Sequence, residues 1–284
     1  MQDAPDILIS AQNLATLRLA GNVIIVDCRF DLSDPEKGRQ DYLRSHVPGA
    51  FYAHLDQDLS SPIHAASGRH PLPDASDFSR FLAGMGWSPG KMLVAYDERN
   101  NAMAARLWWL MRYFGQSAAL LDGGLEAWLD AGLTTETGET SSATAEVVAL
   151  EADPSMVVST EDVLANLQKP EFTLVDARAP ERFSGSIEPL DSRAGHIPGA
   201  INRPLGKNLD ESGFFKRPDE LKGEFEKLLQ PSSPAEAVHS CGSGVTACHN
   251  QFAMELAGLG GSRVYPGSWS EWIRDENRPV QSGS

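Results

Sequence analysis

The sequences VIIVDCR at residues 23–29 and HVPGA at residues 46–50 decide the fold, because both return in the second half of the chain. There, TLVDAR occupies residues 173–178 and HIPGA occupies residues 196–200. The aspartates of the first pair are 149 positions apart, and the histidines of the second pair are 150 positions apart. Segments that recur at a nearly constant offset indicate an internal duplication.

The duplication predicts two domains of similar size. We place the first at residues 1–140 and the second at residues 150–284. The stretch Thr134–Ala145 is rich in Thr, Ser, Gly and Glu and shows no hydrophobic periodicity, which is typical of a linker. The boundary is therefore expected within 135–155.

Each half alternates short apolar runs with longer helical patterns. Strands that alternate with helices favour βαβ units, in which a parallel sheet is covered by helices on both faces. The sequence therefore predicts an α/β fold with two such sheets. The predicted strands lie at 23–26, 92–96, 174–175 and 237–239, and the clearest helices at 102–114 and 246–259.

Composition limits the possible partners and the compartment. The net charge of −15 over 284 residues argues against nucleic acid or an anionic membrane as the main partner, so an anionic substrate needs a local basic site. No apolar run reaches the roughly 18 residues of a membrane span, and the acidic N-terminus is unlike a secretory signal. Three scattered cysteines do not form a disulfide scaffold, which favours the cytoplasm.

The most informative local motif is SCGSGVTA at residues 240–247. Cys241 follows a predicted strand and precedes a predicted helix, and this end of a parallel sheet is where open α/β folds bind their ligands. Glycines in the loop allow backbone N–H groups to point inward, where they can stabilise a thiolate or a persulfide. Cys241 is the predicted nucleophile. The residues predicted to form its binding cradle are Gly242, Ser243, Gly244, Val245 and Thr246.

An alternative interpretation is that Cys241 is a buried structural thiol beside a glycine-rich turn. The duplication separates the two interpretations, because the matching position of the first half is Asp97, in a loop that lacks the glycines. Only the second half then has catalytic equipment, and the first half is predicted to be non-catalytic.

Three other chemistries fit the loop poorly. A Cys-x5-Arg phosphatase needs an arginine where this chain has Ala247. The residues 242–247 formally match a dinucleotide-binding turn, but no acidic residue follows about 20 positions later at the end of a second strand. The spacing of His239, Cys241, Cys248 and His249 matches no closed tetrahedral metal site, so no metal is expected.

These motifs resemble those of the tandem rhodanese-domain sulfurtransferases, and the resemblance covers nearly the whole chain. The loop C-G-S-G-V-T-A is similar to that of 3-mercaptopyruvate sulfurtransferases. In this family, the members that prefer thiosulfate carry two basic residues directly after the cysteine. The residues at these two positions of the present chain, Gly242 and Ser243, are uncharged. Because a thiosulfate dianion benefits from adjacent cations, 3-mercaptopyruvate is the expected donor.

The resemblance implies further site residues. Arg182 and Arg193 are expected to bind the carboxylate and keto group of the donor, although the family spacing after Arg182 lands on Asp191. A Ser-His-Asp relay for protons corresponds to Ser243, His70 and Asp56.

The expected reaction is a double displacement through a Cys241 persulfide, with no metal or organic cofactor. By resemblance, the acceptor is cyanide or a thiol, such as that of thioredoxin. Two alternatives stay open at this point. The chain could be a thiosulfate:cyanide sulfurtransferase that uses the same cysteine, or a non-catalytic module that receives and hands on sulfur.

Overall fold

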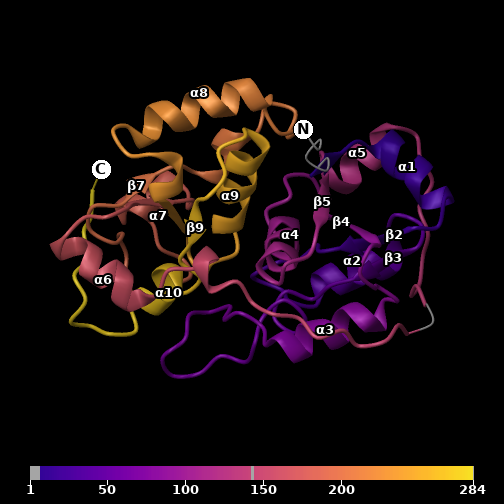
Figure 1. Cartoon of the computed structure of the whole chain (residues 1–284), viewed down its shortest axis with the longest axis horizontal. Helices are drawn as coiled ribbons and strands as arrows, with labels where there is room; N and C mark the ends of the chain where they lie inside the picture. The colour runs from indigo at the N-terminus through magenta and orange to yellow at the C-terminus, as the bar shows by residue number, and fades with distance from the viewer. Residues whose placement is uncertain (1–6, 142–143, 284) are drawn as a thin grey trace. The chain divides into compact units, whose positions relative to one another are not determined.

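The computed structural model describes residues 7–141 and 144–283 and divides the chain into two compact units (Figure 1). Unit 1 comprises Met1–Ser61, Pro73–Asp153 and Glu211–Phe214. Unit 2 comprises Pro62–Leu72, Pro154–Asp210 and Phe215–Ser284. Each unit therefore contains a short segment that the contiguous ranges 1–140 and 150–284 assign to the other half.

The sheet of unit 1 has five parallel strands in the order β1-β5-β4-β2-β3. The hydroxyl of Ser10 starts the first helix by accepting the N–H of Asn13 (3.3 Å). The elements are β1 (Leu8–Ile9), α1 (Ala11–Leu19), β2 (Val23–Asp27), α2 (Lys37–Arg44), β3 (Ala50–Tyr52), α3 (Ala75–Gly84), β4 (Met92–Tyr96), α4 (Ala104–Tyr113), β5 (Ala118–Leu121) and α5 (Gly124–Asp130).

Unit 2 has a sheet of four parallel strands in the order β7-β6-β8-β9. Its first helix begins with a capping box between Ser159 and Asp162. The elements are η1 (Pro154–Met156), α6 (Thr160–Gln168), β6 (Thr173–Asp176), α7 (Pro180–Ser184), β7 (Ile201–Asn202), η2 (Leu205–Asn208), α8 (Pro218–Leu229), η3 (Pro234–Glu236), β8 (Ala237–Ser240), α9 (Ala247–Leu256), β9 (Arg263–Val264) and α10 (Ser268–Trp272).

Helices cover both faces of each sheet, as predicted. In unit 1, alternate strand residues such as Ile25 and Val94 pack with α1 and α5, while their neighbours Ile24 and Leu93 are buried on the opposite face. Figure 1 shows α1 and α5 on one side of this sheet and α3 on the other. In unit 2 it shows α6 and α10 on one side and α8 on the other. Burial on both faces explains why the strand sequences are continuously apolar rather than alternating.

The repeated motifs make the same contacts in both units. Arg29 donates to Asp27 at the end of β2, and Arg178 donates to Asp176 at the end of β6, each with a shortest distance of 2.7 Å. His46 and His196 each place Nδ1 2.7 Å from a carbonyl of the preceding helix. The backbone N–H of each histidine also pairs with a distant strand-like segment. Because both units make this contact and only unit 2 has the cysteine, the two histidines have a structural role.

The predicted elements are confirmed, with shifts at their ends. Strands β2, β6 and β8 are one or two residues longer than predicted, and both clear helices are shorter. Helix α4 begins only at Ala104, because Asn101 has a left-handed φ of 56° that interrupts the helix. Helix α9 ends at Leu256, two residues before Gly258, whose φ is +73°. Within the described parts of the chain, every helix is too short or too polar to cross a membrane.

Candidate active site

Cys241 lies at the carboxyl end of β8, on the loop that leads to α9. Its Sγ accepts the backbone N–H groups of Ser243 (3.4 Å) and Gly244 (3.2 Å), and the residue is 2% exposed. Two inward N–H donors, close to the start of a ten-residue helix, favour negative charge on this sulfur. The loop therefore has the cradle geometry expected from its sequence.

The first residues of α10 hold the loop in place through hydrogen bonds to the backbone of Cys241. The N–H of Trp269 donates to the Cys241 carbonyl (3.0 Å), and the hydroxyl of Ser268 accepts the Cys241 N–H (3.1 Å). Gly244 has a φ of +77°, and a Cβ at this position would lie 2.2 Å from the Pro266 carbonyl oxygen. Only glycine fits here, both because of the backbone conformation and because of this close approach.

The remaining cradle residues are mostly buried. Val245 is buried and Thr246 is half-buried, immediately before the first residue of α9. Cys248, one turn further on, donates its thiol to the Gly244 carbonyl (3.3 Å) and thereby ties the helix to the loop. In the described ranges, 7–141 and 144–283, no three His, Cys, Asp or Glu side chains are grouped as they would be around a metal ion.

The structure brings together two members of the predicted relay. His70 lies on the 62–72 segment of unit 2, and its Nδ1 is 2.7 Å from the Ser243 hydroxyl. The neighbouring backbone N–H of Arg69 donates to Ser270 Oγ (2.9 Å) and anchors this segment. Asp56 belongs to unit 1, where its backbone N–H donates to His54 Nδ1 (3.1 Å). The relay role of Asp56 stays a prediction.

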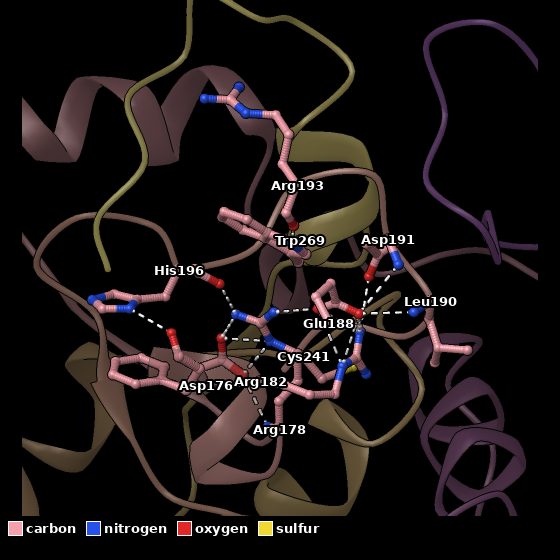
Figure 2. A network of polar contacts seen from close by, with 12 residues as sticks. Asp176, Arg178, Arg182, Glu188, Leu190, Asp191, Arg193, His196, Cys241 and Trp269 are labelled. Atoms are coloured by element: carbon pink, nitrogen blue, oxygen red, sulfur yellow. Dashed lines mark hydrogen bonds and ion pairs between the residues drawn. The ribbon is translucent and has the colours of Figure 1, made fainter. Parts of the chain in front are cut away.

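The structure places the two predicted arginines differently. A Cβ on Gly242 would lie 3.4 Å from Arg182 Nη1, so Arg182 reaches the cysteine loop. Arg193 does not, because its side chain points away from Cys241 in Figure 2 and donates to the Glu276 carbonyl (3.4 Å). In this conformation Arg193 does not reach the cysteine loop, and its expected role in substrate binding stays a prediction.

A different arginine, Arg69, lies beside the loop. Its Nη2 would be 3.1 Å from a Cβ on Gly242, on the same small area that Arg182 approaches. This residue was not predicted from the sequence, because the family spacing places the second arginine downstream of Arg182. Arg69 could have been predicted from its position directly before His70. A segment that places one side chain at the cysteine loop also places the neighbouring residues near it.

Two carboxylates hold these arginines in place. Arg182 forms a bidentate ion pair with Glu188 (shortest distance 2.8 Å) and a second ion pair with Asp191 (2.9 Å). Asp191 also pairs with Arg69, and Glu188 lies 3.5 Å from Arg178. Figure 2 shows the Arg178, Glu188, Arg182 and Asp191 part of this chain of alternating charges beside Cys241.

Burial alone would raise the pKa of Glu188, but the hydrogen bonds from Arg182 and from the N–H groups of Leu190 and Asp191 outweigh it and lower the pKa. Glu188 is therefore an anion at neutral pH. Its bidentate hydrogen bonds fix the direction of the Arg182 guanidinium, whereas Arg178 is oriented by Asp176.

Unit 1 has a carboxylate where unit 2 has the cysteine. Asp97 follows β4 as Cys241 follows β8, and the N–H of Leu125 donates to its carbonyl (2.9 Å) as that of Trp269 does to Cys241. The Asp97 carboxylate accepts N–H groups of Asn101 (2.8 Å) and Met103 (2.9 Å). Burial nevertheless raises its pKa to about 6.

Comparison with known proteins identifies the family. The Rhodanese-like domain model matches residues 10–131 and 159–275. The chain belongs to the rhodanese family. A Pseudomonas aeruginosa protein named as a probable 3-mercaptopyruvate sulfurtransferase is 43% identical over 97% of this chain and 98% of its own length. A mouse thiosulfate sulfurtransferase is 34% identical over 93% of this chain and 89% of its own length.

A solved structure gives the same result for the fold. The 3-mercaptopyruvate sulfurtransferase from Leishmania major superimposes with a TM-score of 0.83 at 30% identity, covering 96% of this chain and 75% of that one. The predicted resemblance to tandem rhodanese-domain sulfurtransferases is thus confirmed, as is the predicted fold of two rhodanese-like domains with parallel sheets.

Proposed function

We propose that this rhodanese transfers sulfane sulfur from 3-mercaptopyruvate to a thiol or cyanide through a persulfide on Cys241. The observation that carries the proposal is the pair of N–H groups aimed at Cys241 Sγ, next to a serine that is hydrogen-bonded to His70. A nucleophilic sulfur and a proton carrier are the two components that this reaction requires.

In the first half-reaction, the Cys241 thiolate attacks the sulfur of 3-mercaptopyruvate. An S–S bond forms, the C–S bond of the donor breaks, and its electron pair leaves with pyruvate enolate. The enolate takes up one proton to give pyruvate, and the terminal sulfur on Cys241 loses one to give the persulfide anion. The inward N–H groups of the loop stabilise the negative sulfur before and after this step.

The Ser243–His70 pair supplies a route for that proton. Both side chains are nearly fully buried, and their 2.7 Å separation allows a proton to pass between imidazole and hydroxyl. Asp56 is proposed to orient His70, following the family resemblance. In the second half-reaction, an acceptor thiolate attacks the outer sulfur and Cys241 leaves as thiolate. Thioredoxin is our proposed protein acceptor.

The choice of donor rests on the residues that touch the reacting sulfur. Positions 242 and 243 carry no cation, and Arg182 lies to the side of the loop at Gly242, where it can meet the carboxylate of 3-mercaptopyruvate. The names of the most similar relatives support this donor, and the mouse relative supports thiosulfate as the alternative. A module that only relays sulfur would not turn over small-molecule donors by itself.

The test is a comparison of kcat/KM for 3-mercaptopyruvate and thiosulfate, with cyanide as acceptor, on the purified chain. We expect a higher kcat/KM for 3-mercaptopyruvate. Mass spectrometry after donor treatment should show one added sulfur on Cys241. Cys248→Ser is the matched control and should still accept sulfur, whereas Cys241→Ser should not. A preference for thiosulfate would select the alternative donor, and full activity of Cys241→Ser would contradict the mechanism.

We also propose the cytoplasm as the compartment. The three cysteines, all within the described residues, are buried thiols that form no disulfide, which suits a reducing environment. Cell fractionation with a specific antibody would test this, and recovery from an oxidising compartment would contradict it.

A further inference from the structure

The carboxylate of Asp191 is buried between the two arginines that reach the cysteine loop. Its side chain is 4% exposed, one oxygen pairs with Arg69 and the other lies 2.9 Å from Arg182 Nη2. Arg69 and Arg182 come from segments far apart in the sequence, and Asp191 is the group that joins them.

The arginines at the loop are therefore not free cations. Arg69 and Arg182 contribute two positive charges, and Glu188 and Asp191 contribute two negative charges. Arg178 is paired with Asp176 at the end of β6. The charge of this cluster beside Cys241 thus sums to zero, although two guanidinium groups lie within reach of Gly242.

An anion that binds at Arg69 and Arg182 meets the Asp191 carboxylate at the same place. Its repulsion by Asp191 grows in proportion to its own charge, so a dianion is penalised about twice as strongly as a monoanion. Because Asp191 is buried, bulk salt screens this repulsion poorly. Discrimination by an added repulsive group is a common source of specificity.

We propose that Asp191 is a specificity-determining residue that favours the singly charged carboxylate of a 3-mercaptopyruvate-like donor and disfavours the thiosulfate dianion. The inference rests on the proposed function of the Cys241 site, and it adds a repulsive element to the missing cations at positions 242 and 243. Asp191 is also the position at which the family spacing after Arg182 predicts an arginine, so the proposal explains the effect of a carboxylate there.

The test measures kcat/KM for both donors in Asp191→Asn, Asp191→Glu and Glu181→Gln. Glu181 is an exposed carboxylate next to Arg182 in sequence, so its variant removes the same charge without touching the cluster. We expect Asp191→Asn to raise the thiosulfate to 3-mercaptopyruvate ratio by roughly tenfold, mainly through a lower KM for thiosulfate. Asp191→Glu and Glu181→Gln should keep the ratio of the unsubstituted chain.

An unchanged or lower ratio in folded Asp191→Asn would overturn the proposal, as would an equal rise in Glu181→Gln. Binding provides a second measurement that needs no turnover. The unsubstituted chain should bind pyruvate more tightly than inorganic sulfate, and Asp191→Asn should reverse or narrow this difference. Tighter sulfate binding by the unsubstituted chain would overturn the role of Asp191. If no donor transfers sulfur, the proposed function fails, while these binding constants still decide the role of Asp191.

Discussion

The hydroxyl of Ser243 is a single atom on which the proposed proton transfer depends. Removing it in Ser243→Ala leaves the N–H groups and the nucleophile intact but breaks the 2.7 Å contact with His70. We expect kcat with 3-mercaptopyruvate to fall by about 100-fold, with a smaller change in KM, because general acid–base catalysis typically contributes that much. Steady-state kinetics and the pH profile of kcat would measure this.

The control for this substitution is Ser262→Ala, another buried serine of unit 2 whose hydroxyl has no hydrogen-bond partner in the described part of the chain. Its activity should match that of the unsubstituted chain. Equal kcat values and pH profiles for Ser243→Ala and the unsubstituted chain would remove Ser243 from the mechanism.

His239 is a buried neutral histidine two residues before the nucleophile. Neither ring nitrogen has a hydrogen-bond partner among the described residues, and burial together with the positive charge of Arg203 lowers its pKa to about 3. The unfolded chain, in which a histidine has a pKa of about 6.5, binds this proton more readily. The free energy of unfolding should therefore fall as the pH drops from about 6.5 towards 3, by up to about 1.4 kcal/mol per pH unit.

His239→Leu removes this dependence and takes no hydrogen-bond partner from another group, because neither ring nitrogen of His239 has one among the described residues. Urea denaturation of both proteins between about pH 4 and pH 7 would measure the difference in slope. Parallel curves for the two proteins would show that His239 is not the titrating group.

At the scale of elements, the loop between β8 and α9 depends on Gly244. Alanine at this position combines a φ of +77° with a Cβ only 2.2 Å from a backbone oxygen, which cannot move without displacing the start of α10. We expect Gly244→Ala to lower the free energy of unfolding by more than about 2 kcal/mol and to abolish persulfide formation. Denaturation and mass spectrometry would test the two effects.

Gly258, just after the end of α9, provides the matched control. It has a similar φ of +73°, but a Cβ there would have no atom within 4 Å. Gly258→Ala should cost about 1 kcal/mol and leave sulfur transfer intact. If both variants lost equal stability, the close approach of the Pro266 carbonyl would not matter.

Elements that depend on local sequence could be predicted, and those that depend on distant packing could not. The strands before Asp27 and Asp176 are short apolar runs repeated in both halves, and the cysteine loop is marked by its glycines. The place of the 62–72 segment in unit 2 is fixed by contacts such as that of Arg69 with Ser270, about 200 positions away. His70 could be found only through the family resemblance, and Arg69 was missed.

The same reason explains the result for Arg193. The family spacing lands on Asp191, and Arg193 was expected at the site as the arginine two residues later. Its backbone carbonyl instead accepts the Trp269 indole N–H (2.9 Å), and its side chain points away from Cys241. Side-chain direction within a loop is set by such tertiary contacts, which no local pattern records.

At the scale of the whole molecule, duplication produced two units with equivalent sheets and different chemistry at equivalent positions. Backbone N–H groups of the loop donate to Cys241 Sγ in unit 2 and to the Asp97 carboxylate in unit 1, from different positions after the strand. In unit 1, Glu98, which is 57% exposed, lies 3.5 Å from Arg29, whereas Glu188 and Asp191 of unit 2 are almost fully buried. The buried charge cluster therefore accompanies the nucleophile.

Asp97 of unit 1 and His239 of unit 2 should make the free energy of unfolding depend on pH in opposite directions. The folded-state pKa of Asp97 is about 6, above the unfolded value of about 3.9, so ionisation of this carboxyl costs stability. Its favourable contribution is present below about pH 4 and is lost as the pH rises through 6. The contribution of His239 in unit 2 has the opposite sign, since it is lost as the pH falls.

The decisive measurement is the difference in free energy of unfolding between the unsubstituted chain and Asp97→Asn at about pH 4, 5, 6 and 7. As the pH rises from 4 to 6, the unsubstituted chain should lose stability relative to Asp97→Asn by up to about 1.4 kcal/mol per pH unit, because the asparagine cannot ionise. Asp130→Asn removes an exposed carboxylate of the same unit and should give a flat difference. A flat difference for Asp97→Asn would mean that the N–H donors of Asn101 and Met103 outweigh burial, and that the equivalent loops of both units stabilise an anion.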